Sequence, residues 1–161
     1  MVRYLKAVLI LFVGLQGLFY AVQNIVNLDQ ARQVVTVVVT MTNHSVYPHH
    51  FGPSITAPAL IWAVVWMIIL GELLVGLLGL KGSYDLLAAA RQSAEKFNAS
   101  KSFAILSCGV SMIIWFGFFL ALGGAYFEMW QTDIGVNSYR DAFMFAASAG
   151  VVMIFVNMRD D

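Results

Sequence analysis

Glu72 lies in an apolar stretch that runs from about Ala57 to Leu78, and it is the only ionisable side chain near the middle of any such stretch. A charged carboxylate in the centre of a bilayer costs on the order of 2.5 to 3.5 kcal/mol by insertion scales. Glu72 therefore needs a partner, a proton or a functional reason. Two interpretations stay open: a structural carboxyl, protonated or hydrogen-bonded to Gln16 and a serine such as Ser111, and a proton or cation site.

Polar side chains share one face of the first apolar stretch. Gln16, Tyr20, Gln23 and Asn27 follow one another at spacings of four, three and four residues, with Asn24 at the edge of the face. Because amides facing lipid are costly, this face is expected to point into a bundle, where each amide can bond a neighbouring helix for roughly 0.6 to 2 kcal/mol. The alternative is the lining of a ligand or ion path.

Three histidines form a second group of residues that could do chemistry. His44, His49 and His50 follow Met41 within ten residues, and imidazole with thioether suits copper, or zinc if the methionine is not a ligand. The spacing matches no strong metal motif, so a solvated loop is expected and no cofactor is predicted. Asn43-His44-Ser45 is formally a glycosylation acceptor, which matters only in a secretory-pathway host.

An aromatic cluster follows the third apolar stretch: Tyr126, Phe127, Met129 and Trp130. Aromatic rings at this position are usually interface anchors. We expect them to pack with Trp62 and Trp66 as a cap over the outer end of the bundle. A surface for a lipid or a partner is the alternative.

Composition shows what must position these residues. Sixty per cent of the 161 residues are hydrophobic and 11% are charged, with a mean hydropathy of +0.79, whereas a soluble domain carries about 25% charged residues. This composition excludes a soluble or disordered chain and indicates a membrane protein. Nine basic and nine acidic residues give no net charge, so nucleic acid is not an expected partner. The single cysteine, Cys108, does not report a redox compartment.

Four stretches approach the roughly 20 apolar residues that a membrane helix needs. They cover about residues 5–27, 57–78, 102–125 and 140–158, which predicts a single all-α domain over 1–161. Pro58 is expected to open the second helix, and Gly79 and Gly82 to close it. Seven of the nine Lys and Arg residues fall on the side of the termini, which places both termini in the cytoplasm.

Two connecting segments carry patterns of their own. Residues 83–101 place apolar side chains at helical spacing among charges, which predicts a short amphipathic helix on the cytoplasmic surface. Gln33–Met41 is a β-branched run in the outer loop, for which we expect a strand or a segment packed on the outer helix ends. The outer loop as a whole is expected to be partly ordered.

Several motifs are spread along the chain: Gln23-Asn24 followed by Asp29, the stretch ending at Met41, Glu72 with its following glycines, and Gly123-Gly124 leading to Tyr126-Phe127 and Met129-Trp130-Gln131, with Asn137 and Ala142-Phe143 beyond. In this order they resemble the pattern of a bacterial family of predicted small integral membrane proteins of unknown function. The chain carries Thr42 and Ala125 where the family pattern has acidic residues. The resemblance covers nearly the whole chain and implies a four-helix protein of the inner membrane, without an activity.

No catalytic motif was found, so a non-enzymatic protein is expected. The leading hypothesis is an accessory or interaction subunit whose partners are the lipid bilayer and a membrane protein or further copies of itself. The alternative is a small transporter or channel subunit that uses Glu72 as a proton or cation site.

Overall fold

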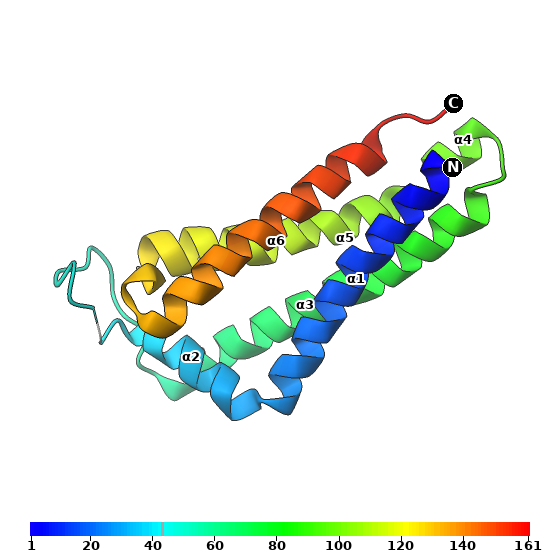
Figure 1. Ribbon diagram of the computed structural model, residues 1–161. Helices are drawn as coiled ribbons and strands as arrows, with labels where there is room; N and C mark the ends of the chain where they lie inside the picture. The colour runs from blue at the N-terminus through cyan, green and yellow to red at the C-terminus, as the bar shows by residue number, and fades with distance from the viewer. Residues whose placement is uncertain (43) are drawn as a thin grey trace.

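A computed structural model describes residues 1–42 and 44–161, and the described residues form helices joined by turns and one longer loop, without a strand (Figure 1). Four of the described helical segments are long and apolar enough to cross a membrane: Val2–Val26, Pro58–Ala89, Ala94–Tyr126 and Asp133–Asn157. The predicted all-α architecture with four spanning segments is confirmed. Asn43, the first residue of the glycosylation pattern, lies outside the described residues.

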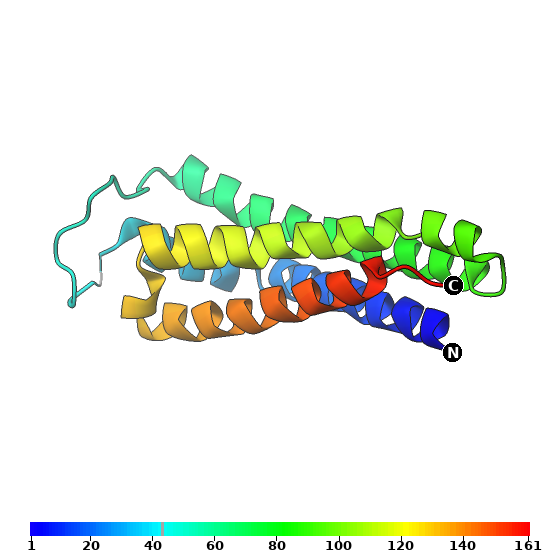
Figure 2. The same cartoon turned by 90° about the horizontal axis from the view of Figure 1, so that it is seen from above.

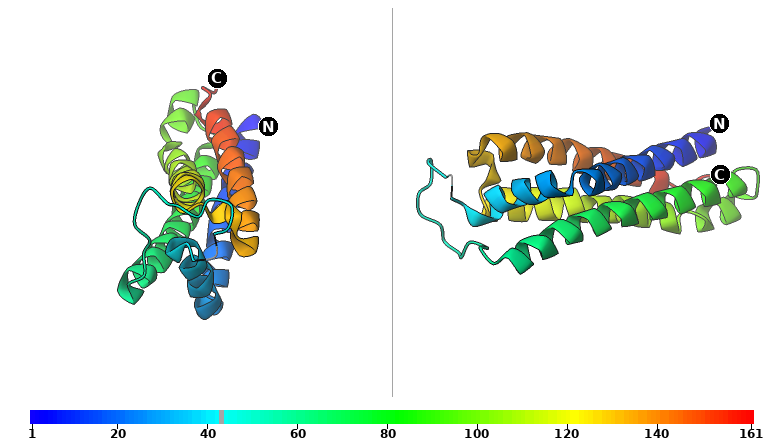
Figure 3. Two further views of the ribbon diagram at one scale, coloured as in Figure 1. Left: turned by 90° about the vertical axis from the view of Figure 1, so that its left-hand side faces the viewer. Right: turned by 90° about the horizontal axis from the view of Figure 1, so that it is seen from below.

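Both chain ends lie at one end of the bundle, here called the terminal end (Figures 1 and 2). The opposite end carries the long connection that follows α2, and is called the loop end. Figure 3 (right) shows the first half of α3 diverging from the other helices toward the loop end. The bundle is therefore tighter at the terminal end.

The first two helices are separated by a break at Asn27. α1 (Val2–Val26) ends where Asn27 leaves the helical region with φ −114° and ψ 45°, and α2 (Leu28–Thr40) follows directly. Figure 1 shows α2 turning away from the direction of α1. The prediction of a strand for the β-branched run is wrong. The alternative, that this run packs on the outer helix ends, agrees with the contact between α2 and α3.

The β-branched run is helical because strand preference depends on packing more than on the backbone itself. Thr36 and Thr40 donate their hydroxyls to the carbonyl oxygens four residues earlier, at 2.7 and 2.8 Å. Val38 and Val39 are buried. A helix also pairs its backbone groups internally, which a lone strand near lipid cannot do.

α3 (Pro58–Ala89) runs past both glycines that were expected to end it. A Cβ on Gly79 would lie 2.5 Å from the Cα of Gly14 in α1, and a Cβ on Gly82 would lie 2.5 Å from the backbone nitrogen of Ala104. The prediction of a helix end at these glycines is wrong because they allow neighbouring backbones to approach a continuous helix.

The amphipathic helix predicted over 83–101 is divided in two. Its first part belongs to α3, whose packed face continues through Leu86 and Ala89. Its second part forms α4 (Ala94–Ala99), whose N-cap Ser93 accepts a hydrogen bond from the Lys96 backbone at 3.4 Å. The predicted length is wrong because Ser93 begins a new helix after a turn.

The third span consists of α5 (Ser102–Met112) and η1 (Ile113–Tyr126), which is wound as a π-helix. After a short turn, η2 (Met129–Gln131), the fourth span α6 runs from Asp133 to Asn157. The predicted start near Arg140 is wrong because Thr132 caps the helix earlier, its hydroxyl accepting from the Gly135 backbone at 3.0 Å.

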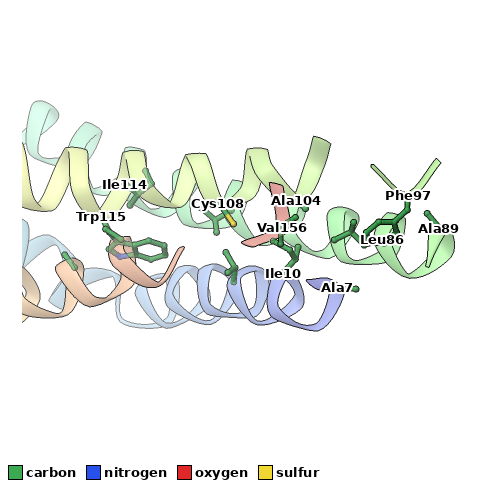
Figure 4. Close-up of a cluster of buried hydrophobic side chains, with 14 residues drawn as sticks. Ala7, Ile10, Leu86, Ala89, Phe97, Ala104, Cys108, Ile114, Trp115 and Val156 are labelled. Atoms are coloured by element: carbon green, nitrogen blue, oxygen red, sulfur yellow. The ribbon is translucent and has the colours of Figure 1, made fainter. Parts of the chain in front are cut away.

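Small residues hold the helices together in the terminal half of the bundle. Ser83 donates to the Ala7 carbonyl at 2.9 Å, and Ser107 donates to the Val75 carbonyl at 2.8 Å. Figure 4 shows the cluster of buried hydrophobic side chains, in which Cys108 lies between neighbouring helices. The serines satisfy their hydroxyls across helices in surroundings that offer little water.

An ionic cluster closes the terminal end. Asp160 bonds the ammonium groups of Lys6 at 2.5 Å and Lys101 at 2.6 Å, and both lysines are almost completely buried. Burial alone would raise the pKa of Asp160, but the bonds from Lys101 and Lys6 outweigh it and lower that pKa below its ordinary value. The C-terminal segment is thereby fixed to the first and third spans.

Candidate functional site

A cavity of about 440 Å³ lies between the helices in the loop half of the bundle. Its walls come from the end of α1, from α2, from the diverging half of α3, from η1 and from α6. Apolar side chains make most of this lining: Val34, Val35, Val38, Val39, Ile55, Val64, Val65, Met67, Ile68, Ile69, Trp115, Phe118, Phe119, Leu122, Phe127, Met129, Ala142 and Phe145.

Polar groups line the cavity in small number. Glu72 is 1% exposed, and its carboxyl oxygen Oε2 accepts a 2.9 Å hydrogen bond from the side-chain amide of Asn24. Tyr20, Ser138 and Asp141 also contribute to the lining. A large apolar cavity with a few placed polar groups is the usual form of a small-molecule site.

The packing of α1 on α3 positions the Glu72–Asn24 pair. A Cβ on Gly17 would lie 2.7 Å from the Glu72 carbonyl oxygen, and a Cβ on Gly76 would overlap the Leu18 side chain. Because only glycine fits at these crossings, the two backbones approach closely enough for the short Asn24 side chain to reach Glu72.

The lining has an acidic character. Glu72 and Asp141 supply carboxyl groups, while no Lys, Arg or His lines the cavity among the described residues. Such a site suits a molecule with an apolar body and a head that is cationic or donates hydrogen bonds.

The predicted partners of Glu72 differ from the observed one. The expected bond to Gln16 or a serine is not formed within the described chain: Ser107 bonds Val75, and the Ser111 hydroxyl is buried without a partner there. Counting residues along antiparallel helices gives depth but not rotation about the helix axis. Asn24, at the edge of the polar face, was therefore the harder partner to predict.

The polar face of α1 only partly points into the bundle. Gln23 is exposed and Gln16 is partly buried, and neither lines the cavity, whereas Tyr20 and Asn24 do. Asp141 was not predicted as a site residue, because the fourth span was expected to begin beside it, at about Arg140. Asp141 lies one turn before Phe145 on α6. Had the helix been predicted to start earlier, this spacing would have placed both residues on the same face.

The aromatic residues after the third span are divided between the long loop and the cavity. Tyr126 donates its hydroxyl to the Pro53 carbonyl at 3.1 Å and packs its ring on Phe51, with centroids 5.1 Å apart. Trp130 packs on Tyr47 at 5.4 Å. Phe127 and Met129 turn inward and line the cavity. The loop aromatics thus take the place expected for Trp62 and Trp66; Trp62 instead lies against the Arg32 guanidinium, 5.7 Å from its ring centroid.

The histidines of the loop do not all meet. His44 and His50 lie beside each other, with ring centroids 5.1 Å apart, and both approach Glu128, while His49 is exposed. Burial lowers the pKa of His44 below its ordinary value; His50 adds to this effect and Glu128 opposes it. This lowering favours the neutral form of the His44 imidazole.

These observations define a small multi-pass integral membrane protein with a partly open cavity between its helices. Residues 2–159 match the family described as "Predicted small integral membrane protein (DUF2165)", and the chain belongs to that family. The resemblance inferred from the sequence motifs is confirmed. No curated protein and no solved structure matches the chain.

Proposed function

We propose that the protein binds an amphipathic molecule within the membrane. The carrying observation is the cavity of about 440 Å³, apolar except for a few polar groups that include the bonded pair of Glu72 and Asn24. The apolar body of the ligand occupies the space between α2, α3 and η1. Its cationic or hydrogen-bond-donating head meets the Glu72 carboxyl. The proposed role is binding, without a covalent step.

The packing of the bundle supports binding over conduction by a channel. Between Glu72 and the terminal end, Gly14 and Gly79 bring two backbones together, and Ser83 and Ser107 bond across helices. Close contacts of this kind are typical of a packed interior, which an ion path would have to open. A transporter function with Glu72 as a proton or cation site therefore requires a second conformation.

The test compares variants by mass spectrometry of molecules that stay bound after purification from native membranes in mild detergent. Ala31→Phe places a large ring in the cavity lining, and Ala63→Phe makes the same change on an exposed position of α3. We expect wild type and Ala63→Phe to retain a bound amphipathic molecule that Ala31→Phe loses. Identical bound molecules in all three would refute the proposal.

The contribution of the polar groups of the cavity is tested separately. Glu72→Gln removes the acidic group inside the cavity, and Glu95→Gln removes one on the exposed part of α4. We expect only Glu72→Gln to reduce retention of the molecule. Proton or cation uptake into liposomes that depends on Glu72 would establish the transporter form of the proposal.

A second candidate function, an accessory subunit, is supported by two glycines on the third span. A Cβ on Gly109 or Gly117 would meet nothing within 4 Å, and Ile113 and Phe116 between them are exposed. Small residues with free space beside them allow the backbone of another membrane helix to approach. The same purification should then recover a companion protein or a homo-oligomer; a monomer without companions would argue against this function.

We also propose that the protein lies in a bacterial inner membrane with the terminal end in the cytoplasm. The excess of Lys and Arg toward that end supports this orientation. In a Cys108→Ser background, Phe51→Cys and Ser93→Cys report opposite ends through an impermeant maleimide applied to spheroplasts. Labelling should occur at position 51 only; labelling confined to position 93 would reverse the orientation.

A further inference from the structure

We propose that His44, His50 and Glu128 form a binding site for Zn²⁺ at the loop end. The Nδ1 atoms of the two imidazoles lie 3.6 and 3.4 Å from the same carboxyl oxygen, Oε2 of Glu128. One candidate ligand atom from each residue falls within 4.8 Å of the other two. The site is separate from Glu72 and does not rest on the proposed function.

The distances fit metal ligands better than direct hydrogen bonds. Hydrogen bonds from nitrogen to oxygen fall at about 2.7 to 3.2 Å. Two ligands bound at about 2.1 Å to one tetrahedral zinc ion lie about 3.4 Å apart. The separations from Glu128 to His44 and His50 match that spacing, and imidazole with carboxylate is a donor set that zinc accepts.

The burial of His44 points independently to a missing partner. Its side chain is 0% exposed, and neither ring nitrogen has a hydrogen-bond partner among the described residues. The Nδ1 atom of His50 is also buried without one. Buried polar atoms are nearly always satisfied by protein, water or an ion. A cation between the two rings and Glu128 would satisfy them together.

Glu128 is held in place by its neighbours. Gln131 donates from Nε2 to Glu128 Oε2 at 2.5 Å, and its Oε1 accepts from the backbone nitrogens of Val46 and Tyr47, both at 2.9 Å. Glu128 adopts a left-handed backbone conformation with φ 49°, which is uncommon for a residue with a side chain. Gln131 is therefore a positioning residue that sets both the carboxyl and the loop carrying the histidines.

A bound ion would join the long loop to the turn between the third and fourth spans. Phe127 and Met129, on either side of Glu128, line the membrane cavity. The ion would thus fix the outer wall of that cavity. Three protein ligands leave one position of a tetrahedral ion for solvent.

The test is calorimetric titration of the full-length protein with ZnCl₂ in detergent, after removal of any purification tag and of metal by a chelator. We expect one Zn²⁺ per chain for the wild type. His44→Ala and Glu128→Gln should abolish measurable binding, and Gln131→Ala should weaken it about 10- to 100-fold, as for other groups that orient metal ligands. His49→Ala, in the same loop but outside the cluster, is the matched control and should bind as the wild type does.

Spectroscopy and folding controls keep the outcome clear. Co²⁺ should give the visible absorption of a tetrahedral site in the wild type and in His49→Ala, but not in His44→Ala. Helix content and elution in detergent establish that each variant is folded. Absence of zinc binding to the folded wild type would overturn the proposal. Binding that His49→Ala abolishes while Glu128→Gln leaves it unchanged would do so as well.

Discussion

The side-chain amide of Asn24 donates a 2.9 Å hydrogen bond to the carboxyl of Glu72, joining α1 to α3 at a polar part of the cavity. The two residues lie 48 positions apart in the chain, and the close helix crossing at Gly17 brings them together. One bond thus contributes both to the packing of the bundle and to the polar character of the cavity.

Loss of this bond should destabilise the protein. Asn24→Ala leaves a buried oxygen of Glu72 without its donor, which typically costs about 1 to 3 kcal/mol. Gln23→Ala changes an exposed neighbour on the same helix and should stay within about 0.5 kcal/mol. Chemical unfolding in detergent micelles measures both. Equal effects of the two variants would show that the bond contributes little.

The glycine crossing between α1 and α3 should tolerate no side chain. Gly79→Ala places a methyl group against the Gly14 backbone, so we expect a loss of about 1 to 3 kcal/mol, as for overpacking in a tight interior. Gly109→Ala adds the same methyl group in open space and should stabilise the helix by about 0.5 to 1 kcal/mol. Thermal unfolding distinguishes the expected destabilisation by Gly79→Ala from the expected stabilisation by Gly109→Ala. An unchanged unfolding temperature for Gly79→Ala would contradict the observed packing.

Asp160 should be necessary for the closed terminal end. Asp160→Asn leaves the buried ammonium groups of Lys6 and Lys101 without their anion, and breaking a buried ion pair in this way costs about 3 to 5 kcal/mol. Asp161→Asn is the control, because Arg3 bonds a main-chain oxygen of Asp161, which this substitution leaves in place, and not its side-chain carboxyl. A difference in unfolding free energy below about 1 kcal/mol between the two would contradict the assignment.

The same cluster predicts a pH dependence. The pKa of Asp160 is lowered on folding, so near pH 4 the unfolded chain binds more protons at this residue than the folded protein does. The stabilisation is complete above the ordinary pKa of about 3.9 and is lost as the pH falls through the lower pKa of the folded state. The unfolding midpoint of the wild type should therefore fall toward that of Asp160→Asn on acidification. If the unfolding midpoints of the wild type and Asp160→Asn changed in parallel with pH, the ionic role of Asp160 would be refuted.

Thr132 should set the start of α6. Its hydroxyl accepts from the Gly135 backbone, and removal of such a cap costs about 1 kcal/mol. Thr132→Ser keeps the hydroxyl and should behave as the wild type, whereas Thr132→Ala should unfold at a lower temperature. Equal unfolding temperatures for Thr132→Ala and Thr132→Ser would show that the Thr132 cap does not stabilise α6.

Local sequence patterns were sufficient to predict that four spans exist, but not where each one begins and ends. The length and apolarity of each stretch predict a helix directly, since the bilayer requires internal pairing of backbone groups. Gly79 and Gly82 misled the prediction because a glycine that ends a helix and a glycine that admits a neighbouring backbone look the same in sequence. The β-branched run became α2 for a similar reason: its conformation depends on what it packs against.

The sequence by itself determined that this chain is a four-span membrane protein and that Glu72 needs a partner. Tertiary structure alone decided that the partner is Asn24 and that Asp141 joins the cavity lining. It also selected His44 and His50 over His49 and added Glu128, 78 residues beyond His50. Periodicity along one helix gives depth and face, but contacts between distant segments depend on how helices rotate and cross, which the packing of the whole chain sets.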